Sequence, residues 1–546
     1  MNCKKDTVVY QIYPRSFADS DADGYGDLVG IISRLPYIKE LGANAIWLSP
    51  IYLSPDHDNG YDVADYKMIH PRFGTMDDFD RLVKEARALG IDIIMDLIIN
   101  HTSDEHEWFR RAMKGEEKYR NYYIIKEGKD GKVPNNWGNF FAECPWTKLP
   151  ESENEYYFHL FSKKQPDLNW ENPDVLDEIE GIMRFWLDRG VRGFRCDVIN
   201  VIGKESFNDG KKKLILTGSE NYLSKESCHD ILRKLRTDVL EPYGAWAVGE
   251  TVFVGTDDAH AFTADTRGEL DMVFSFEHME CDQRAVKWFK KRLNKKQLMR
   301  TLTRWQTSLD WNALYFENHD QPRFISRLPG AEKYRAEASC MVAGLLMSLR
   351  GTPFVYQGQE LGMTNGDFSS MDEIEDIESH NVYAFAKKLL LSRRARFNMI
   401  KKSSRDNART PMQWSGEVGA GFTQGEPWLK INKNHSWINV EWEKARDGGV
   451  LDFWQKMIAK RKSVGALREG SFKVISENGS IYAYERAHEG TRYLCICNMT
   501  PKALTLPKKL VGGKLDLSSY KKPQIAKLMP FEFRLVRLSD GTAAEK

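Results

Sequence analysis

The sequence has no apolar run long enough to cross a bilayer, and it has no extended basic tract. A transmembrane helix needs about 20 apolar residues, so we expect no membrane partner. The 79 Lys and Arg residues balance the 78 Asp and Glu residues, which gives a formal net charge of +1. Proteins that bind nucleic acid concentrate positive charge, so this balance does not indicate such a partner. The sequence also shows no internal repeat and no low-complexity linker.

Cysteine is scarce and scattered. The eight residues stand at positions 3, 144, 196, 228, 281, 340, 495 and 497, without the spacing of a zinc site. The segment from Met1 to Lys5 leads directly into a short apolar run that differs from a secretory signal. Free thiols without such a signal are typical of a reducing compartment. We therefore expect a cytoplasmic protein, and we expect it to act as a monomer without an organic cofactor.

Three apolar runs end in acidic side chains. Residues 193–200 follow an amphipathic helix and carry Arg195 and Asp197, which a strand places on one face. The next two runs end in Glu250 and Asp320. Unpaired buried carboxylates are costly, and catalytic groups in a parallel barrel come from the C-terminal ends of several strands. The three acids are therefore candidates for one catalytic site, whereas an isolated Arg-x-Asp pair would indicate a structural ion pair.

Strand-like and helix-like segments alternate over most of the chain, which indicates an α/β fold with a parallel sheet. The pattern breaks at 102–170, a polar and aromatic stretch too long for an ordinary loop, which predicts an inserted small domain. Short alternating strands after the helix at 451–463 predict an antiparallel β-sandwich. The expected segments are 1–102 and 171–470 for the main domain, 103–170 for the insertion and 471–546 for the C-terminal domain.

An acidic loop with aspartates at period 2 follows the first predicted strand. It crowds oxygen atoms as the first half of an EF-hand loop does. It departs from that pattern at the twelfth position, where Gly30 replaces the bidentate Glu. A solvated acidic turn is the alternative, but we expect a structural Ca²⁺, with Mg²⁺ as the second choice. The expected ligands are Asp19, Asp21, Asp23, Asp27 and the carbonyl of Tyr25.

Four short stretches resemble the α-amylase superfamily, glycoside hydrolase family 13: residues 96–101, 193–200, 247–251 and 316–320. Their order and spacing extend the resemblance along nearly the whole chain. The resemblance implies a (β/α)8 TIM barrel with a domain inserted after the third strand and a C-terminal β-domain. It also implies that Asp197 is the nucleophile, Glu250 the general acid/base and Asp320 a third carboxylate that holds and distorts the sugar.

Two further stretches, 165–169 and 408–414, are similar to the oligo-1,6-glucosidase subfamily. That resemblance implies an exo-acting α-glucosidase that releases glucose from short isomalto-oligosaccharides. By the same resemblance Val198 accompanies cleavage of α-1,6 rather than α-1,4 bonds. The residues that it assigns to the glucose-binding subsite are Asp58, Tyr61, His101, Phe161, Arg195, His319 and Arg409. His101 and His319 are expected to donate hydrogen bonds to sugar hydroxyls.

Glycoside hydrolysis needs two carboxyl groups beside the anomeric carbon. We expect Arg195 to lower the pKa of Asp197 and the nearby carboxylates to raise the pKa of Glu250. The alternatives are a trehalose-6-phosphate hydrolase, a broader α-1,4/α-1,6-glucosidase and a sucrose-active relative. A trehalose-6-phosphate hydrolase needs cationic side chains to bind the phosphate. This sequence instead has Phe276-Glu277-His278-Met279, and Glu317 before Asn318, which resemble the residues of a glucosidase. A non-catalytic transporter subunit would have lost the three acids.

Overall fold

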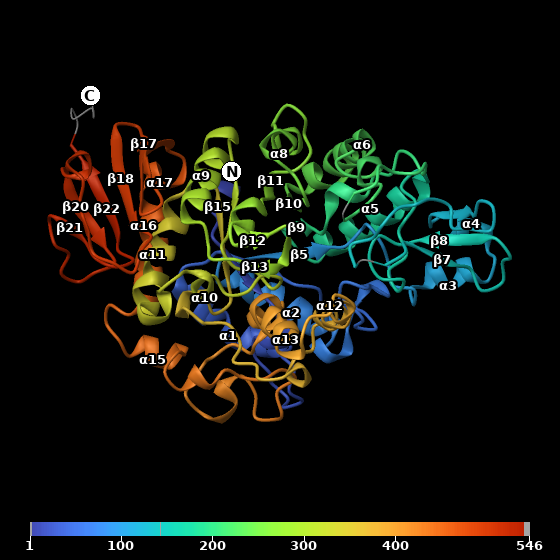
Figure 1. Ribbon diagram of the computed structural model, residues 1–546, viewed down its shortest axis with the longest axis horizontal. Helices are drawn as coiled ribbons and strands as arrows, with labels where there is room; N and C mark the ends of the chain where they lie inside the picture. Colours follow the sequence, from blue (N-terminus) through green and yellow to red (C-terminus); the bar gives the residue numbers. More distant parts are fainter. Residues whose placement is uncertain (1–2, 142, 214, 540–546) are drawn as a thin grey trace. The chain divides into compact units, whose positions relative to one another are not determined.

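The computed structural model describes residues 3–141, 143–213 and 215–539. Eight strands form a closed barrel in the order β1-β15-β14-β11-β10-β9-β5-β2, and the strand registers within it are parallel (Figure 1). The α/β barrel predicted from the sequence is confirmed. The strands are β1 (Val9–Ile12), β2 (Ala45–Leu48), β5 (Asp92–Leu97), β9 (Gly193–Cys196), β10 (Trp246–Glu250), β11 (Met272–Phe274), β14 (Ala313–Leu314) and β15 (Thr352–Tyr356).

The chain divides into two compact units, and each is described by itself. One comprises Met1–Ile46, Glu85–Ile91 and Phe276–Lys546, and the other comprises Trp47–Lys84 and Asp92–Ser275. The helices include α1 (Leu28–Leu41), α2 (Met76–Ala88), α5 (Pro173–Asp188), α6 (Glu226–Leu235), α8 (Thr256–Thr263), α9 (Lys295–Ser308), α11 (Arg335–Ser348) and α16 (Val450–Ser463). In the part of the chain that is described, no helix is long and apolar enough to cross a membrane.

The segment from α5 to β9 shows how the sequence builds one helix–strand unit. The side chain of Asn172 caps the first turn of α5, and Pro173 follows at a position where its missing N–H costs no hydrogen bond. The helix buries one apolar face and ends before Gly190, which has φ 100°, a conformation that glycine adopts most readily. In β9, a Cβ on Gly193 would lie 2.4 Å from the carbonyl oxygen of Trp246, so the strands approach closely there.

The predicted insertion forms a small sheet and two short helices. The three antiparallel strands have the order β6-β8-β7, and an aromatic cluster that includes Trp137, Trp146 and Phe158 packs with residues beyond β9. The boundaries predicted for the four segments remain predictions. The elements are α3 (Glu107–Met113), α4 (Glu117–Arg120), β6 (Ile125–Glu127), β7 (Trp146–Lys148) and β8 (Glu155–Phe158).

The C-terminal part is an antiparallel sheet in the order β16-β17-β18-β22-β20, with a two-stranded sheet of β19 and β21. The larger sheet, red in Figure 1, contacts α11 and α17 (Gly465–Arg468). The predicted antiparallel C-terminal domain is confirmed. The strands are β16 (Ser471–Glu477), β17 (Ile481–His488), β18 (Thr491–Asn498), β19 (Leu504–Thr505), β20 (Lys514–Ser518), β21 (Lys527–Leu528) and β22 (Phe533–Leu538).

Candidate active site

One guanidinium group joins the acidic residues at the ends of β9 and β10. Arg195 lies in β9, Asp197 follows this strand directly, and Glu250 is the last residue of β10. Arg195 Nη1 donates a hydrogen bond to Oδ1 of Asp197 at 2.6 Å, and Nη2 donates to Oε2 of Glu250. Arg195 is 3% exposed, so water screens these ion pairs poorly. The arrangement holds the two carboxyl groups next to each other.

Asp96 in β5 completes this group, although sequence reasoning did not single it out as a site residue. Its Oδ1 accepts a hydrogen bond from Arg195 Nη1 at 2.5 Å. Its Oδ2 accepts from Trp47 Nε1 at 3.1 Å and from the Tyr61 hydroxyl at 3.3 Å. Asp96 therefore orients Arg195 toward the other carboxyl groups. The available signal was an Asp within the otherwise apolar run at 91–99.

The protonation of this group differs from the expectation. Burial raises the pKa of Asp197 well above its usual value. Arg195 lowers this pKa, but its effect is smaller than the combined effect of burial, Glu250 and Asp96, which raise it. Burial also raises the pKa of Asp96 to about 6. Arg195 thus lowers the pKa of Asp197, as expected, but burial and the two other carboxyl groups on the same guanidinium outweigh its effect. A proton in such a group belongs to the coupled carboxyls rather than to one residue.

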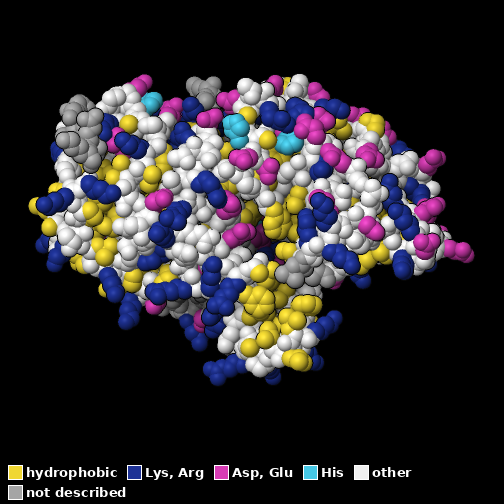
Figure 2. All heavy atoms as spheres, turned by 45° about the horizontal axis from the view of Figure 1, so that its top comes forward, with side chains coloured by type: hydrophobic (Ala, Val, Ile, Leu, Met, Phe, Trp, Pro, Cys, Tyr) yellow, Lys and Arg dark blue, Asp and Glu magenta, His cyan; other side chains and the backbone are white. Residues whose placement is uncertain are grey.

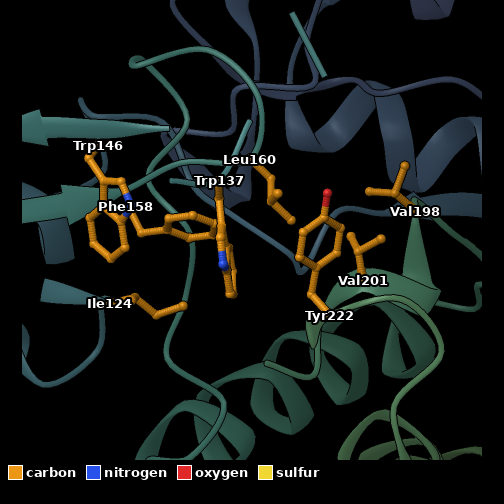
Figure 3. Packing of buried hydrophobic residues seen from close by; sticks show 8 residues of the cluster. All are labelled: Ile124, Trp137, Trp146, Phe158, Leu160, Val198, Val201 and Tyr222. Carbon is orange, nitrogen blue, oxygen red and sulfur yellow. The ribbon is translucent and has the colours of Figure 1, made fainter. Parts of the chain in front are cut away.

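Val198, directly after Asp197, has a strained backbone. Its φ of 35° and ψ of 41° lie in the left-handed region, which is costly for a β-branched residue. Its side chain packs with Leu160, Val201 and Tyr222 in an apolar cluster (Figure 3), and its N–H lies 3.4 Å from Oε2 of Glu250. The site thus places a buried apolar side chain beside the two acids.

Asn200 ties together the segments that follow β9 and β10. Its Nδ2 donates to the carbonyl of Val252 at 2.9 Å, and its Oδ1 accepts from the N–H of Val252 at 2.9 Å. Nδ2 also contacts the hydroxyl of Ser224 at 3.2 Å. These bonds fix the distance between the two segments that carry Asp197 and Glu250.

His101 is held by protein groups on both ring nitrogens. Nε2 lies 3.0 Å from the carbonyl oxygen of Tyr61, and Nδ1 lies 3.1 Å from Nδ2 of Asn100. Burial lowers its pKa, which favours the neutral ring, and Nε2 also lies 3.2 Å from Nε2 of Gln165. Gln165 Nε2 donates to Asp58 and to the same Tyr61 carbonyl, each at 3.3 Å. His101 thus positions the Tyr61 segment here, and its donation to sugar remains a prediction.

An aromatic row begins at His101. The ring of Phe161 lies 5.2 Å from the ring of His101 and stacks on Phe140 at 4.8 Å, with an interplanar angle of 7°. Phe140 stacks in turn with Phe253 at 6.4 Å. Phe253 is 59% exposed and has φ 57°. Sequence reasoning identified Phe161 and missed the other two rings, because no sequence spacing marks residues that meet through the fold.

A buried ion pair supports the His101 segment. Lys204 Nζ lies 2.8 Å from Oδ2 of Asp167 and donates to Oδ1 of Asn100 at 2.7 Å. The Lys204 and Asp167 side chains are 3% and 0% exposed, and burial lowers the pKa of Lys204. The other oxygen of Asp167 accepts from the N–H of Leu160 at 2.9 Å. This network fixes the end of the inserted segment to the residues beyond β5.

Asp320 belongs to the other compact unit. It lies in the loop after β14 and not at a strand end as predicted, because β14 ends at Leu314. Its Oδ1 accepts from Arg409 Nη2 at 2.7 Å, and its Oδ2 lies 3.2 Å from His319 Nε2. Burial raises its pKa, but the positive charges of His319, Arg405 and Arg409 outweigh burial and hold the pKa well below the usual value. Asp320 is therefore ionised.

Arg409 also offers a free donor. Its Nε donates to the carbonyl of His319 at 2.9 Å, and the ring of Tyr13 lies 5.4 Å from the guanidinium. Its buried Nη1 has no hydrogen-bond partner among the residues described. An unsatisfied buried donor is costly, so this atom is a candidate contact for a sugar hydroxyl. The structure thus groups Arg409, His319 and Asp320, as the sequence predicted.

The acidic loop brings three of its four aspartates together. Ligand oxygens of Asp19, Asp21 and Asp27 lie within 4.8 Å of one another. Asp23 does not belong to this group, and its Oδ1 accepts from the N–H of Tyr25 at 2.7 Å. Asp19 is half-buried, Asp21 is exposed and Asp27 is buried. Three such carboxylates fit a hard cation, and Asp19 keeps its charge because hydrogen bonds lower its pKa against the effect of burial. Bound Ca²⁺ remains a prediction.

We expect removal of this cation to destabilise the fold. A ligand that binds only the folded state raises stability, so a chelator should lower the Tm of the protein as purified, and added Ca²⁺ should restore it. The variant Asp21→Asn should melt at the lower temperature with or without chelator. A melting curve that the chelator leaves unchanged, together with no metal in elemental analysis, would contradict the prediction.

Comparison with known proteins places this geometry in a family. Residues 11–470 match the family model described as the catalytic domain of alpha amylase. An oligo-1,6-glucosidase of Bacillus cereus is 44% identical over 528 residues, which cover 94% of each chain. The structure of a trehalose-6-phosphate hydrolase of Bacillus licheniformis is 39% identical, with a TM-score of 0.92 over 97% of this chain and 99% of that one.

An isomaltulose synthase of Klebsiella sp. LX3 is also similar in structure. It is 35% identical and has a TM-score of 0.94, and the match covers 98% of this chain and 99% of that one. The family model spans the chain from β1 to the last helix before the C-terminal sheet. With its barrel and its acidic site, this chain belongs to the alpha-amylase family and is a glycoside hydrolase that acts on a small carbohydrate substrate.

Proposed function

We propose that the protein is a retaining, exo-acting α-glucosidase that hydrolyses α-1,6 bonds at the non-reducing ends of short isomalto-oligosaccharides. The observation that carries the proposal is the bridge of Arg195 between Asp197 and Glu250. Retaining glycosidases keep their two carboxyl groups only about 5–5.5 Å apart. Two carboxyl groups that bind the same guanidinium lie close together, as in retaining enzymes. Inverting enzymes keep the two groups farther apart.

In this proposal the reaction has two displacements. The Asp197 carboxylate attacks the anomeric carbon while Glu250 gives its proton to the leaving oxygen, which forms a glycosyl ester and releases the shortened sugar. Glu250, now ionised, takes a proton from water, and the water oxygen displaces Asp197 to release glucose. Asp320, which its cationic neighbours keep ionised, accepts hydrogen bonds from glucose hydroxyls. Arg409 donates to a hydroxyl through Nη1.

The α-1,6 preference is argued from Val198. A 1,6 linkage adds a methylene between the rings, and a buried apolar side chain beside the acids can contact it. Such a contact is worth only about 1–3 kcal/mol, so the preference should be graded. The similarity to oligo-1,6-glucosidases supports the same assignment. Arg304 donates a hydrogen bond to Glu277, and Arg323 donates one to Glu317. Because each arginine is already paired with an acid, these positions give no support to a phosphate site.

A substrate panel tests the proposal. We would measure kcat/KM for isomaltose, isomaltotriose, maltose, sucrose and trehalose 6-phosphate, and follow the anomer of the released glucose by proton NMR. Isomaltose as the best disaccharide and α-glucose as the first product are the expected results. Higher efficiency on trehalose 6-phosphate, or conversion of sucrose into an isomer, would replace the proposal by one of the alternatives.

Val198→Thr should raise the efficiency on maltose relative to isomaltose by roughly 10-fold. Thr is β-branched like Val, so the substitution keeps the cost of the left-handed backbone and changes mainly polarity. The new hydroxyl can bond to a 1,4-linked sugar and loses contact with the methylene of a 1,6 linkage. The measurement is the ratio of the two kcat/KM values. An unchanged ratio would show that Val198 is not the selector.

Glu250→Gln should shift the pH dependence of the first displacement to lower pH. Asp197 must be ionised to attack, and the Glu250 carboxylate raises its pKa. Without that charge the pKa of Asp197 falls, so activity persists to lower pH. The measurement is kcat/KM against pH with 2,4-dinitrophenyl α-glucoside, whose leaving group needs no protonation. An acid limb at the wild-type position would contradict the coupling of the two groups.

A further inference from the structure

A helical hairpin in the larger unit concentrates positive charge. It consists of α12 (Ile377–Lys388) and α13 (Arg393–Ser403), which contact each other. Residues 377–403 contain seven Lys or Arg and one Glu, a net charge of +6, whereas the whole chain has +1. The single acid, Glu378, is bound by Lys287 at 2.5 Å. The hairpin is therefore a strongly basic element on an otherwise slightly acidic protein.

One side of the hairpin belongs to the protein core. Ile400 is buried in a cluster with Trp288 and Leu429, and Val382 and Phe397 pack against it. This contact explains how the hairpin is held. It does not involve the connection between the two helices, which carries apolar side chains of its own.

The tip combines exposed apolar groups with exposed cations. Phe385, Leu389 and Leu390 are 50%, 52% and 93% exposed. In Figure 2, yellow side chains bordered by dark blue Lys and Arg lie at the lower edge of the view, in the region of α12 and α13. Among the residues described, the exposed cations at the tip form no ion pair; they are Lys387, Lys388, Arg393 and Arg394.

The tip is not optimised for local stability. Leu390 has φ 58°, which costs a residue with a side chain more than it costs glycine. Arg393 and Arg394 occupy the first turn of α13, where the helix dipole disfavours cations. Polar side chains at the positions of the two exposed leucines would be more favourable in contact with water. Strain, an unfavourable charge position and apolar exposure therefore coincide at one connection of four residues, which points to a function in binding.

We propose that this tip docks on the surface of a membrane rich in anionic phospholipid. Cations beside a negative leaflet and apolar side chains that enter the boundary of headgroups and acyl chains are the two requirements of peripheral binding. A nucleic acid would use the cations but has no apolar surface for two leucines. The described residues form no membrane-spanning helix, so the contact is peripheral. The proposal is independent of the linkage that the enzyme cleaves.

Vesicle sedimentation with the full chain tests this proposal. We expect binding to vesicles of equal parts phosphatidylglycerol and phosphatidylcholine, release at 0.5 M NaCl, and no binding to pure phosphatidylcholine. Leu389→Gln with Leu390→Gln should lower partitioning at least tenfold, since burial of each leucine is worth about that factor or more. Replacing the four tip cations by Gln should abolish binding, because each contributes roughly fivefold.

Matched controls exist in the same unit. Val418→Gln with Ile525→Gln changes two residues that are 97% and 85% exposed, and it should leave binding unchanged. Gln at four exposed lysines elsewhere should weaken binding far less than loss of the tip cations; these lysines are Lys502, Lys508, Lys522 and Lys527. All variants should keep the wild-type Tm and the wild-type kcat/KM on a soluble glucoside.

Three outcomes would overturn the proposal. The first is absence of wild-type binding to the anionic vesicles. The second is equal binding to pure phosphatidylcholine. The third is a double leucine variant that binds like wild type while double-stranded DNA displaces the vesicles, since the tip would then be a general site for polyanions and not a membrane site.

Discussion

Asp197→Asn should lower the turnover of an α-glucoside by roughly 10⁴-fold or more and leave the fold intact. Removing a covalent nucleophile costs up to about 10⁶-fold in well-studied hydrolases, and an amide cannot form the glycosyl ester. The side chain is nearly isosteric, and Asn keeps an oxygen that can accept from Arg195. We therefore expect the Tm to change little, and the measurements are the Tm and the kcat with isomaltose.

A matched change tests whether loss of any aspartate in this unit has the same effect. Asp188 lies at the end of α5 and accepts a hydrogen bond from the Tyr243 hydroxyl at 2.7 Å, so Asp188→Asn should keep wild-type kcat. Near-normal turnover in folded Asp197→Asn protein would remove the nucleophile assignment. Equal loss in both variants would indicate a structural cause.

Lys204→Met should destabilise the protein by about 3–5 kcal/mol, the usual cost of breaking a buried ion pair by removing one partner. The variant leaves the carboxylate of Asp167 uncompensated and deprives Asn100 of its donor. Denaturant unfolding followed by fluorescence and circular dichroism gives the loss of free energy. Because Asn100 precedes His101, KM should rise as well.

Two further variants separate charge from size. Asp167→Asn combined with Lys204→Met removes both charges and should recover much of the stability, since isolated buried charge is the main cost. Lys225→Met breaks a pair with Glu205 whose side chains are 26% and 38% exposed, and it should cost no more than about 1 kcal/mol. A Lys204→Met protein as stable as Lys225→Met would contradict the role of the buried pair.

The fold followed from the sequence where local pattern and burial agree. The apolar run at 91–99 became β5 because a strand covered on both sides needs apolar residues throughout. β14 was harder, because it has two residues and the apolar run continues beyond it to Phe316. The register of such a short strand comes from its neighbours in the barrel, so its end could not be read from its own sequence.

Parts of the site were predictable because carboxylates after apolar runs are conspicuous. The protonation of Asp197 could not be predicted, since it depends on how many carboxyl groups meet one guanidinium after folding. One of them, Asp96, comes from another strand. The row from Phe161 to Phe253 likewise joins rings distant in sequence. Asp23 continues the period-2 spacing of Asp19 and Asp21, yet it is not in their group, and its carboxylate accepts from the N–H of Tyr25.

The left-handed backbone of Val198 has a consequence for protein engineering. Gly or Asn would adopt a φ of 35° at lower cost than a β-branched residue. A campaign that selects only for thermal tolerance would therefore favour replacing Val198, because such changes commonly raise stability at the expense of activity. The selected variants would resist heat better, but they would lose the preference for α-1,6 bonds that we attribute to Val198. Selection at residue 198 should accordingly be scored on product composition and not on survival after heating.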